Sequence, residues 1–304
     1  MNRQEILLRY IKKNEPGVEI GPSLRPIAPK KEGFNVHIID HLSQEELKTK
    51  YKHRNTDIIE KVDFVWNGES YSELTGKKKY YKYVIASHVI EHTPDLIKFI
   101  NDCDLILHDN GFIVLAIPDK RYCFDYFRPY TGISKIIDSH LANHISPTVG
   151  TIVESLLYVT RKGGKIAWNL HEKGDFQLMN TIDQALKFTN PLKKYNKYRD
   201  THVWCFTPNS FRLIIQDLFS LGLIAVKEID FIQRNNGGEF YIILGRTGKG
   251  LKESRLTMLQ RIEKEQIEVT KSNQHNIQNI DSGLVTFLRA AIQRVARRFP
   301  RLIH

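Results

Sequence analysis

Short apolar runs rich in β-branched residues recur along the first 120 residues and end at polar or turn-forming residues. Five runs each predict a β-strand, at 17–20, 34–39, 61–66, 82–86 and 111–117. Two of the intervening stretches, 43–51 and 93–108, carry helical signals. This alternation predicts a parallel sheet with helices on both faces.

The two helix predictions rest on capping residues and on an apolar stripe. Ser43, followed three residues later by Glu46, forms a capping-box pattern. Thr93 is the expected N-cap of the second helix, with Pro94 at its first position and Asn110-Gly111 at its end. Apolar residues in this helix recur at steps of three or four: Leu96, Phe99, Ile100, Cys103 and Leu107.

After Pro118 the regular pattern breaks, and it resumes at Thr207-Pro208, a second Thr-Pro helix start. Helices are expected near 133–145 and 149–160, so that an insertion of about 118–206 is predicted to be largely helical. The last two strands, 224–232 and 239–244, flank an Asn- and Gly-rich turn and predict an antiparallel hairpin. The predicted fold class is therefore α/β, with a doubly wound, mostly parallel sheet and a terminal antiparallel hairpin.

Composition excludes several classes of protein. The chain has 304 residues, 41% of them hydrophobic and 26% charged, which excludes a disordered chain. No run approaches the roughly 18–20 apolar residues of a membrane-spanning helix, and the first residues lack the pattern of a secretory signal. Three cysteines without a CxxC pair are typical of a reducing compartment, so that a cytoplasmic protein is expected.

About half of the net charge of +11 lies in a tail, 247–304, which has eleven Lys and Arg and five Asp and Glu from Lys249 onward. Apolar residues of segment 285–301 share one helical face, and its arginines carry charge without acids among them. This pattern predicts a helix that lies peripherally on an anionic membrane, at the inner face. Docking on its own domain or on a second copy of the chain is the alternative, so a homo-oligomer also stays open. No nucleic acid is expected, because aromatic residues do not interleave with the basic ones.

Small or polar residues follow four predicted strands, where ligands bind in open α/β sheets: Gly21, Asp40, Asn67-Gly68 and Ser87-His88. Asp40 lies 19 residues after Gly21, about the separation at which an acid binds a pair of ribose hydroxyls. An Asx-type turn or a helix cap is the alternative for Asp40. Gly21-Pro22 lacks the Gly-x-Gly-x-x-Gly pattern that holds a pyrophosphate, which disfavours NAD and leaves a ribose ligand without phosphate.

Several segments together resemble class I S-adenosylmethionine-dependent methyltransferases of the type-11 group. They are Val18-Glu19-Ile20-Gly21-Pro22, Asp40, the run Ser-His-Val-Ile-Glu-His-Thr-Pro-Asp at 87–95, and 111–122. Segments 118–129 and 202–211 resemble bacterial members encoded among glycan-biosynthesis functions. The resemblance covers about 15–246. It implies a Rossmann-like, seven-stranded methyltransferase domain over 1–246, with the insertion as the acceptor lid and 247–304 as a basic helical tail.

The resemblance also implies S-adenosylmethionine as the cofactor and a set of binding residues. These would be Glu19, Gly21, Pro22 and Ser23 in the first loop, Asp40 at the ribose, Asn67, Gly68 and Glu69 beside the adenine, and Ser87 and His88 beside the sulfonium. The sequence departs from the family at Gly21-Pro22-Ser23, where the second glycine of Gly-x-Gly is missing.

Methyl transfer to a hydroxyl or carboxyl of a glycan, a lipid-linked sugar or a related small acceptor is the implied reaction. A hydroxyl acceptor profits from a general base, and histidine is the usual one. His202 is the first candidate for this role, followed by His140 and His88. His140 and His144 have the spacing of two metal ligands, but the glutamate of HExxH is absent, and no metal site is predicted.

Aromatic residues gather at the start of the insertion together with Arg128. They suit either a platform for a sugar ring or the attachment of the insertion to the sheet: Tyr122, Phe124, Tyr126, Phe127 and Tyr130. The missing glycine and the lack of an unambiguous base leave one alternative function. The chain would then be a non-catalytic binding or scaffold protein with a degenerate methyltransferase fold.

Overall fold

The computed structural model describes residues 2–189, 199–234 and 237–267. The chain divides into two units, Met1–Arg255 and Leu256–His304. Residues 256–267 of the second unit are helical, and the helix predicted at 285–301 lies outside the described residues. Among the described residues, no helix is long and apolar enough to cross a membrane.

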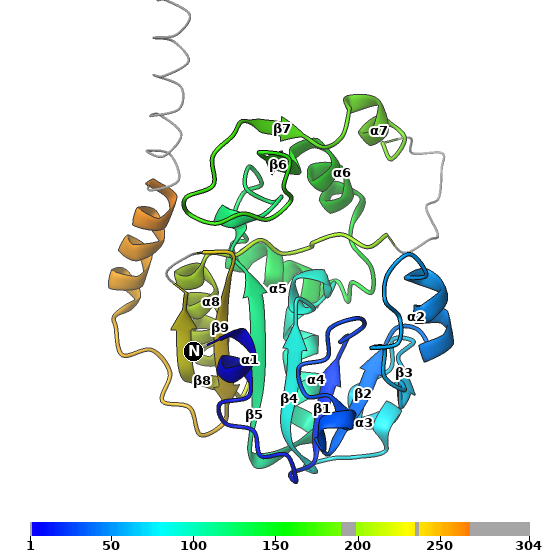
Figure 1. Ribbon diagram of the computed structural model, residues 1–304. Helices are drawn as coiled ribbons and strands as arrows, with labels where there is room; N and C mark the ends of the chain where they lie inside the picture. The colour runs from blue at the N-terminus through cyan, green and yellow to red at the C-terminus, as the bar shows by residue number, and fades with distance from the viewer. Residues whose placement is uncertain (1, 190–198, 235–236, 268–304) are drawn as a thin grey trace, which may run out of the picture. The chain divides into compact units, whose positions relative to one another are not determined.

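A seven-stranded sheet forms the centre of the first unit, in the order β3-β2-β1-β4-β5-β9-β8 (Figure 1). The first five strands are parallel to one another, whereas β9 runs antiparallel to both β5 and β8. This order confirms the predicted fold class and agrees with the seven-stranded sheet that the resemblance implied. The strands are β1 (Gly17–Ile20), β2 (Val36–Asp40), β3 (Phe64–Val65), β4 (Tyr81–Ser87), β5 (Leu107–Pro118), β8 (Lys227–Gln233) and β9 (Glu239–Gly245).

Alternate residues of the strands supply two apolar cores, one on each face of the sheet. One face is covered by α3 (Tyr71–Thr75), α4 (Leu96–Ile106), α5 (Ile133–Leu141) and α8 (Pro208–Ser220), which bury Val84 and Ala86 of β4. The other is covered by α1 (Arg3–Leu7) and the loop from β1 to β2, which bury Tyr83 and Ile85. Only a short helical turn, η1 (Lys30–Glu32), lies in that loop, whereas α2 (Gln44–Lys50) follows β2.

Two of the three predicted helix starts are confirmed. Ser43 and Glu46 form a capping box at α2, and Thr207 caps α8 with Pro208 in the first turn. The prediction for Thr93 was wrong. Its hydroxyl donates to the carbonyl of Ile90 at 2.8 Å, which closes the short turn η2 (Ile90–His92). Asp95 instead accepts from the Lys98 N–H at 2.9 Å and caps α4, and β5 begins directly after this helix, at Leu107.

The insertion lies between β5 and α8, and its base is held by a bridge between Asp119 and Phe206. The two expected helices are confirmed as α5 and α6 (Val149–Tyr158). The rest comprises η3 (Lys120–Tyr122), α7 (Ile182–Leu186) and a two-stranded sheet that was not predicted, β6 (Thr160–Lys162) with β7 (Phe176–Leu178). Strands of three residues are too short to show the alternation that a sequence prediction needs.

Candidate active site at the carboxyl ends of the strands

The loop after β1 bends sharply at Gly21, whose φ of +63° lies in the left-handed region that favours glycine. Its N–H donates to the carbonyl of Ile39 at 2.8 Å, and a Cβ at this position would lie 3.0 Å from a methyl of Val89. Pro22 and Ser23 follow. The Ser23 Oγ is buried, also at a positive φ (+47°), and has no hydrogen-bond partner among the described residues. The loop therefore leaves a buried hydroxyl unpaired, two residues after the point where Gly21 approaches Val89.

Glu19 stabilises the conformation of this loop. Its two carboxylate oxygens accept the N–H groups of Ile27 and Ala28 at 2.7 and 3.0 Å. Burial raises its pKa to about 7, although both backbone donors act in the opposite direction. The carboxylate is thus already bonded within the chain, which sequence reasoning alone does not reveal.

Asp40 ends β2 and is 3% exposed. Its Oδ1 accepts from the His41 N–H at 2.8 Å, whereas Oδ2 is buried and has no hydrogen-bond partner among the described residues. A buried carboxylate oxygen without a donor is costly and rare. A hydroxyl of a ribose would supply the missing donor, so this residue fits the role that the resemblance implied.

Asn67, Gly68 and Glu69 form a turn after β3, next to Asp40. The N–H of Trp66 donates to the Asp40 carbonyl at 2.8 Å, and its indole Nε1 donates to the Glu69 carbonyl at 2.7 Å. The Asn67 N–H donates to the Glu69 carboxylate at 2.9 Å. The structure therefore brings this predicted group beside Asp40 but also shows it bonded within its own turn.

Ser87 and His88 end β4 and are held by residues that the sequence analysis did not identify. Arg3 donates to the Ser87 Oγ at 2.6 Å and to Glu239 at 2.8 Å, and His88 Nε2 lies 2.9 Å from Glu239. Burial alone would lower the pKa of His88, but Glu239 and Glu91 outweigh it and raise the pKa to about 9. His88 is therefore charged at neutral pH, which disfavours the general-base role expected for it.

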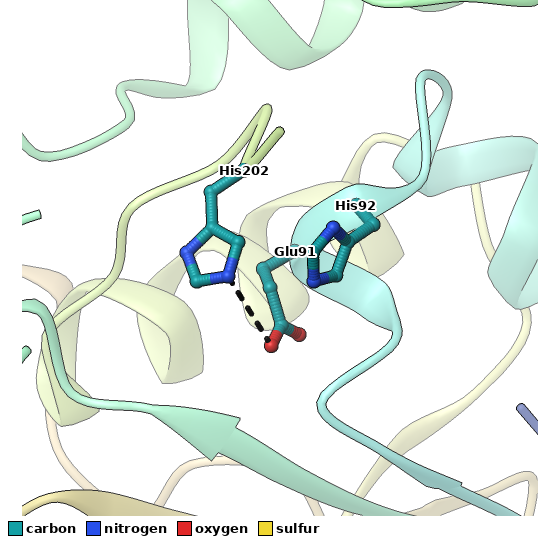
Figure 2. A group of neighbouring side chains, drawn as sticks. All are labelled: Glu91, His92 and His202. Atoms are coloured by element: carbon teal, nitrogen blue, oxygen red, sulfur yellow. Dashed lines mark ion pairs between the residues drawn. The ribbon is translucent and has the colours of Figure 1, made fainter. Parts of the chain in front are cut away.

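His202 lies far from β4 in the sequence, but in space its segment lies beside η2, the turn that follows β4. The carbonyl of Glu91 accepts the N–H of Val203 at 2.7 Å, which fixes the segment around His202 against η2. His202 Nδ1 lies 2.5 Å from Asp125, and its Nε2 lies 3.9 Å from Glu91 Oε1 (Figure 2). The Asp125 carboxylate thus orients the ring, leaving Nε2 toward Glu91. His202 is 7% exposed.

Glu91 is the residue that sequence reasoning missed, although it lies inside the motif of the resemblance. It is 0% exposed, and neither of its oxygens has a hydrogen-bond partner among the described residues. Burial would raise its pKa, but His88, His202 and His92 outweigh this and lower it, so that the side chain is ionised. A buried, ionised and unbonded carboxylate is characteristic of functional sites.

The structure does not bring His140 together with Glu91 and His202. It lies on α5, half-exposed, with Nδ1 2.8 Å from Asp95. His144 Nδ1 lies 2.9 Å from the Ser139 hydroxyl. The group of possible metal ligands found among the described residues is a different one, Glu91, His92 and His202.

The aromatic residues of the insertion mainly pack on one another. Tyr126 stacks on Phe176 with ring centroids 4.7 Å apart, and Arg128 is buried in ion pairs with Asp125 and Glu154. Arg128 is therefore engaged in attachment of the insertion and not in the acceptor platform considered above. Phe124 differs, since it lines a cleft in the insertion together with Ile152, Ser155, Leu156, Val159, Ile166, Met179, Asn180, Arg199, Asp200 and Thr201. The cleft reaches the residue that precedes His202.

No protein-family model and no curated protein matches the sequence. Among solved structures, an S-adenosylmethionine-dependent methyltransferase from Methanosarcina mazei is 12% identical, with 80% of this chain and 98% of that chain covered and a TM-score of 0.40. The CcbJ methyltransferase from Streptomyces caelestis is 11% identical, with 81% and 96% covered and a TM-score of 0.41. A putative Zn-dependent alcohol dehydrogenase from Rhodobacter sphaeroides is 11% identical, with 80% and 88% covered and a TM-score of 0.40. Because these identities and TM-scores are low, the assignment of the fold rests on the strand order, and the inference of function rests on the site.

Proposed function

We propose that the protein is an S-adenosylmethionine-dependent methyltransferase that acts on a hydroxyl or carboxyl of a glycan, a lipid-linked sugar or a related small acceptor. The observation that carries this proposal is the unpaired, buried Oδ2 of Asp40 at the carboxyl end of β2. It lies in a sheet of the order expected for class I methyltransferases, and the loop after the neighbouring strand β1 lacks the glycine pattern that holds a pyrophosphate. The type-11 group and the glycan context are supported by the sequence segments that resemble those proteins.

The residues at the strand ends would hold the cofactor in distinct ways. Asp40 would accept hydrogen bonds from the ribose hydroxyls. Gly21 allows a ligand to come close to the backbone because it has no side chain. The unpaired Ser23 Oγ is available to a polar group of the methionine part. When bound, S-adenosylmethionine supplies a methyl group on a sulfonium, which is already an electrophile, so that alignment and the exclusion of water are the main tasks of the protein.

The acceptor would enter through the cleft of the insertion. Its lining combines apolar side chains with Arg199 and Asp200 and ends at Thr201. His202 Nε2 is the imidazole nitrogen that Asp125 leaves available, and a proton from an acceptor hydroxyl would pass to it as the oxygen gains the methyl group. Phe124 packs on the His202 ring at 4.6 Å and limits access of water from one side.

Calorimetric titration with S-adenosylmethionine tests the proposal. Saturable binding by the wild type is expected, with binding lost or strongly weakened in Asp40→Ala. No heat with the wild type, or unchanged heat with Asp40→Ala, would overturn the proposal. Incubation with methyl-labelled cofactor and a panel of sugars and sugar lipids then identifies the acceptor through transfer of the label.

One observation favours the non-catalytic alternative. The Ser87 hydroxyl, expected beside the sulfonium, accepts from the Arg3 guanidinium at 2.6 Å, which places a positive charge near the end of β4. A sulfonium there would meet the charge of Arg3, which the ion pair with Glu239 offsets only in part. Cofactor binding without transfer to any acceptor, together with tighter binding by Arg3→Met, would favour this alternative.

We also propose, from the sequence of segment 285–301, that the tail binds an anionic membrane surface. Flotation with liposomes of anionic lipid compares the full chain with one that ends after Gly283. Flotation of the full chain alone is the expected result, and equal flotation of both forms would contradict it.

A further inference from the structure

We propose that Glu91, His92 and His202 bind a divalent metal ion of the zinc type. One ligand atom from each lies within 4.8 Å of the others, and both rings turn a nitrogen toward the Glu91 carboxylate (Figure 2). Imidazole nitrogen with carboxylate oxygen is a common ligand set for zinc and its neighbours in the transition series. The ion's role in catalysis rests on the proposed function, but its binding does not.

The first argument is the state of Glu91. The side chain is fully buried, and neither oxygen has a hydrogen-bond partner among the described residues. Its nearest basic atoms, His88 Nδ1 and His202 Nε2, lie 3.4 and 3.9 Å from Oε1, beyond hydrogen-bond distance or close to its limit. His88 offsets part of the charge, but a buried carboxylate without a hydrogen bond to either oxygen is still costly, and a bound cation would supply the missing contacts.

The second argument is the way the rings are held. His202 Nδ1 lies 2.5 Å from Asp125 Oδ2, so that Nε2 is left for a ligand. His92 Nδ1 lies 2.7 Å from Asp200 Oδ1, although outside good hydrogen-bond geometry. In metal sites, a carboxylate typically holds the second nitrogen of each ligating histidine and fixes its orientation.

The third argument is the distance that remains to be closed. Two ligands of a tetrahedral zinc ion lie about 3.3 Å apart, given bonds of about 2.0–2.1 Å. The separation of His202 Nε2 from Glu91 Oε1 is 3.9 Å, and the backbone bond from Val203 to Glu91 keeps the two segments together. This pair would have to approach by about 0.6 Å, and the other pairs by at most about 1.5 Å, to reach that separation.

Three protein ligands leave a fourth position, as in catalytic zinc sites. The His92 side chain is 30% exposed, so the group borders on solvent at this residue. A hydroxyl bound at the fourth position would be polarised by the ion and would release its proton to water more readily. His202 would then hold the ion and not the proton, which makes the two roles of Nε2 alternatives set by metal occupancy.

The test uses the full chain without an affinity tag, freed of metal by a chelator and dialysed. It is titrated with cobalt(II) chloride, followed by visible absorption, and with zinc chloride by calorimetry. One ion per chain is expected, with affinity lowered more than about 100-fold in Glu91→Gln and His92→Gln. Asp125→Asn keeps the ligands but loses the orienting carboxylate, and about 10–100-fold weaker binding is expected. The matched control is His140→Gln, since His140 has a similar contact with Asp95 but lies outside the group; it should bind like the wild type.

Absence of saturable binding, or equal affinity in the wild type, His92→Gln and Glu91→Gln, would overturn the metal site. If circular dichroism shows that Glu91→Gln does not fold, the affinity of His92→Gln decides whether the site exists, because His92 is partly exposed. Titration of the metal-free chain with S-adenosylmethionine keeps the two proposals apart. Cofactor binding without cobalt binding overturns the metal site alone, and cobalt binding without cofactor binding overturns the proposed function alone.

Discussion

Two regions of the molecule bury polar groups but satisfy them differently. The first is the base of the insertion, formed by Asp119, Arg121, Asp125 and Arg128. The second is the strand-end site, formed by Gly21, Ser23, Asp40 and Glu91. Asp119 and Asp125 each accept from a buried arginine, at 2.6 and 2.8 Å. Burial alone would raise the pKa of Asp125, yet His202 and Arg128 hold it at about 2.

The strand-end site lacks such close hydrogen bonds, although His88 Nδ1 and His202 Nε2 lie 3.4 and 3.9 Å from Glu91 Oε1. The Ser23 Oγ, Asp40 Oδ2 and both Glu91 oxygens are buried without a hydrogen-bond partner among the described residues. Tyr83 and Thr207 also carry a buried hydroxyl without a partner, but at the strand ends several such groups occur together, two carboxylates among them. This grouping indicates where a ligand supplies the partner. The base of the insertion is thus a structural network, and the strand-end site is a ligand site.

The largest effect is expected at the base of the insertion. Arg128→Met leaves Asp125 buried with part of its charge unpaired and should lower the free energy of unfolding by about 3–5 kcal/mol, measured by urea denaturation. The control is Arg9→Met, which removes a half-exposed pair with Asp230 and should cost less than about 1 kcal/mol. Equal losses in the two variants would remove the contrast between the regions.

Glu19 sharpens the comparison, because it is buried but bonded to two backbone N–H groups. Its pKa in the folded protein, about 7, exceeds the ordinary value of 4.5, so its contribution to stability is complete below pH 4.5 and is lost as the pH rises to about 7. At 1.36 kcal/mol per pKa unit this amounts to roughly 3 kcal/mol.

Glu19→Gln should therefore remove this pH dependence, so that its stability relative to the wild type improves by up to that amount between pH 4.5 and pH 8. Urea denaturation at several pH values measures the difference. Glu45→Gln, at a carboxylate that is 79% exposed, is the control and should leave the dependence unchanged. A parallel pH dependence in the wild type and Glu19→Gln would show that Glu19 titrates normally in the folded protein.

Asp40→Asn should separate binding from stability. The Oδ1 of asparagine can still accept from the His41 N–H, Oδ2 has no partner to lose, and the ion pair of Oδ1 with the half-exposed His41 ring is weak. Stability should therefore change by less than about 1 kcal/mol. Affinity for S-adenosylmethionine should fall about 10–100-fold, or about 1.4–2.7 kcal/mol, by calorimetry. Asp63→Asn is the opposite control, because Asp63 accepts from Lys30 and from the Ile38 N–H. Asp63→Asn should lose stability and retain its affinity for S-adenosylmethionine. The reverse outcome in the two variants would refute the separation of binding from stability.

The elements that carry strong local signals were predictable. The parallel strands, the capping box at Ser43, the helix start at Thr207-Pro208 and the terminal hairpin follow from period, caps and turn residues that lie within a few positions of one another. The cap at Asp95 was missed because Thr93-Pro94 is equally good by sequence, and only the turn that Thr93 closes with Ile90 decides between them.

The site was predictable at single positions but not as a set. Asp40 could be found because its distance from Gly21 is a local spacing. The contacts of His202 with Asp125 and of Arg3 with Ser87 span 77 and 84 residues, and no pattern in the sequence encodes such pairs. The same limit explains why Glu91 was passed over, since its significance lies in the partners that it lacks.

The smallest effect is expected at Gly21, where backbone strain and a close approach coincide. Gly21→Ala forces alanine into φ +63° and brings its Cβ to 3.0 Å from Val89, so a loss of about 1–2 kcal/mol in stability is expected. Gly76→Ala is the matched control, with a similar φ of +64° and no atom within 4 Å of the added Cβ. The strain common to both variants cancels, and what remains measures the approach to Val89. Weaker binding of S-adenosylmethionine in Gly21→Ala than in Gly76→Ala would show that the ligand needs this space. Equal affinity in the two would mean that the glycine serves only the turn, and the strand-end site would then begin at Asp40.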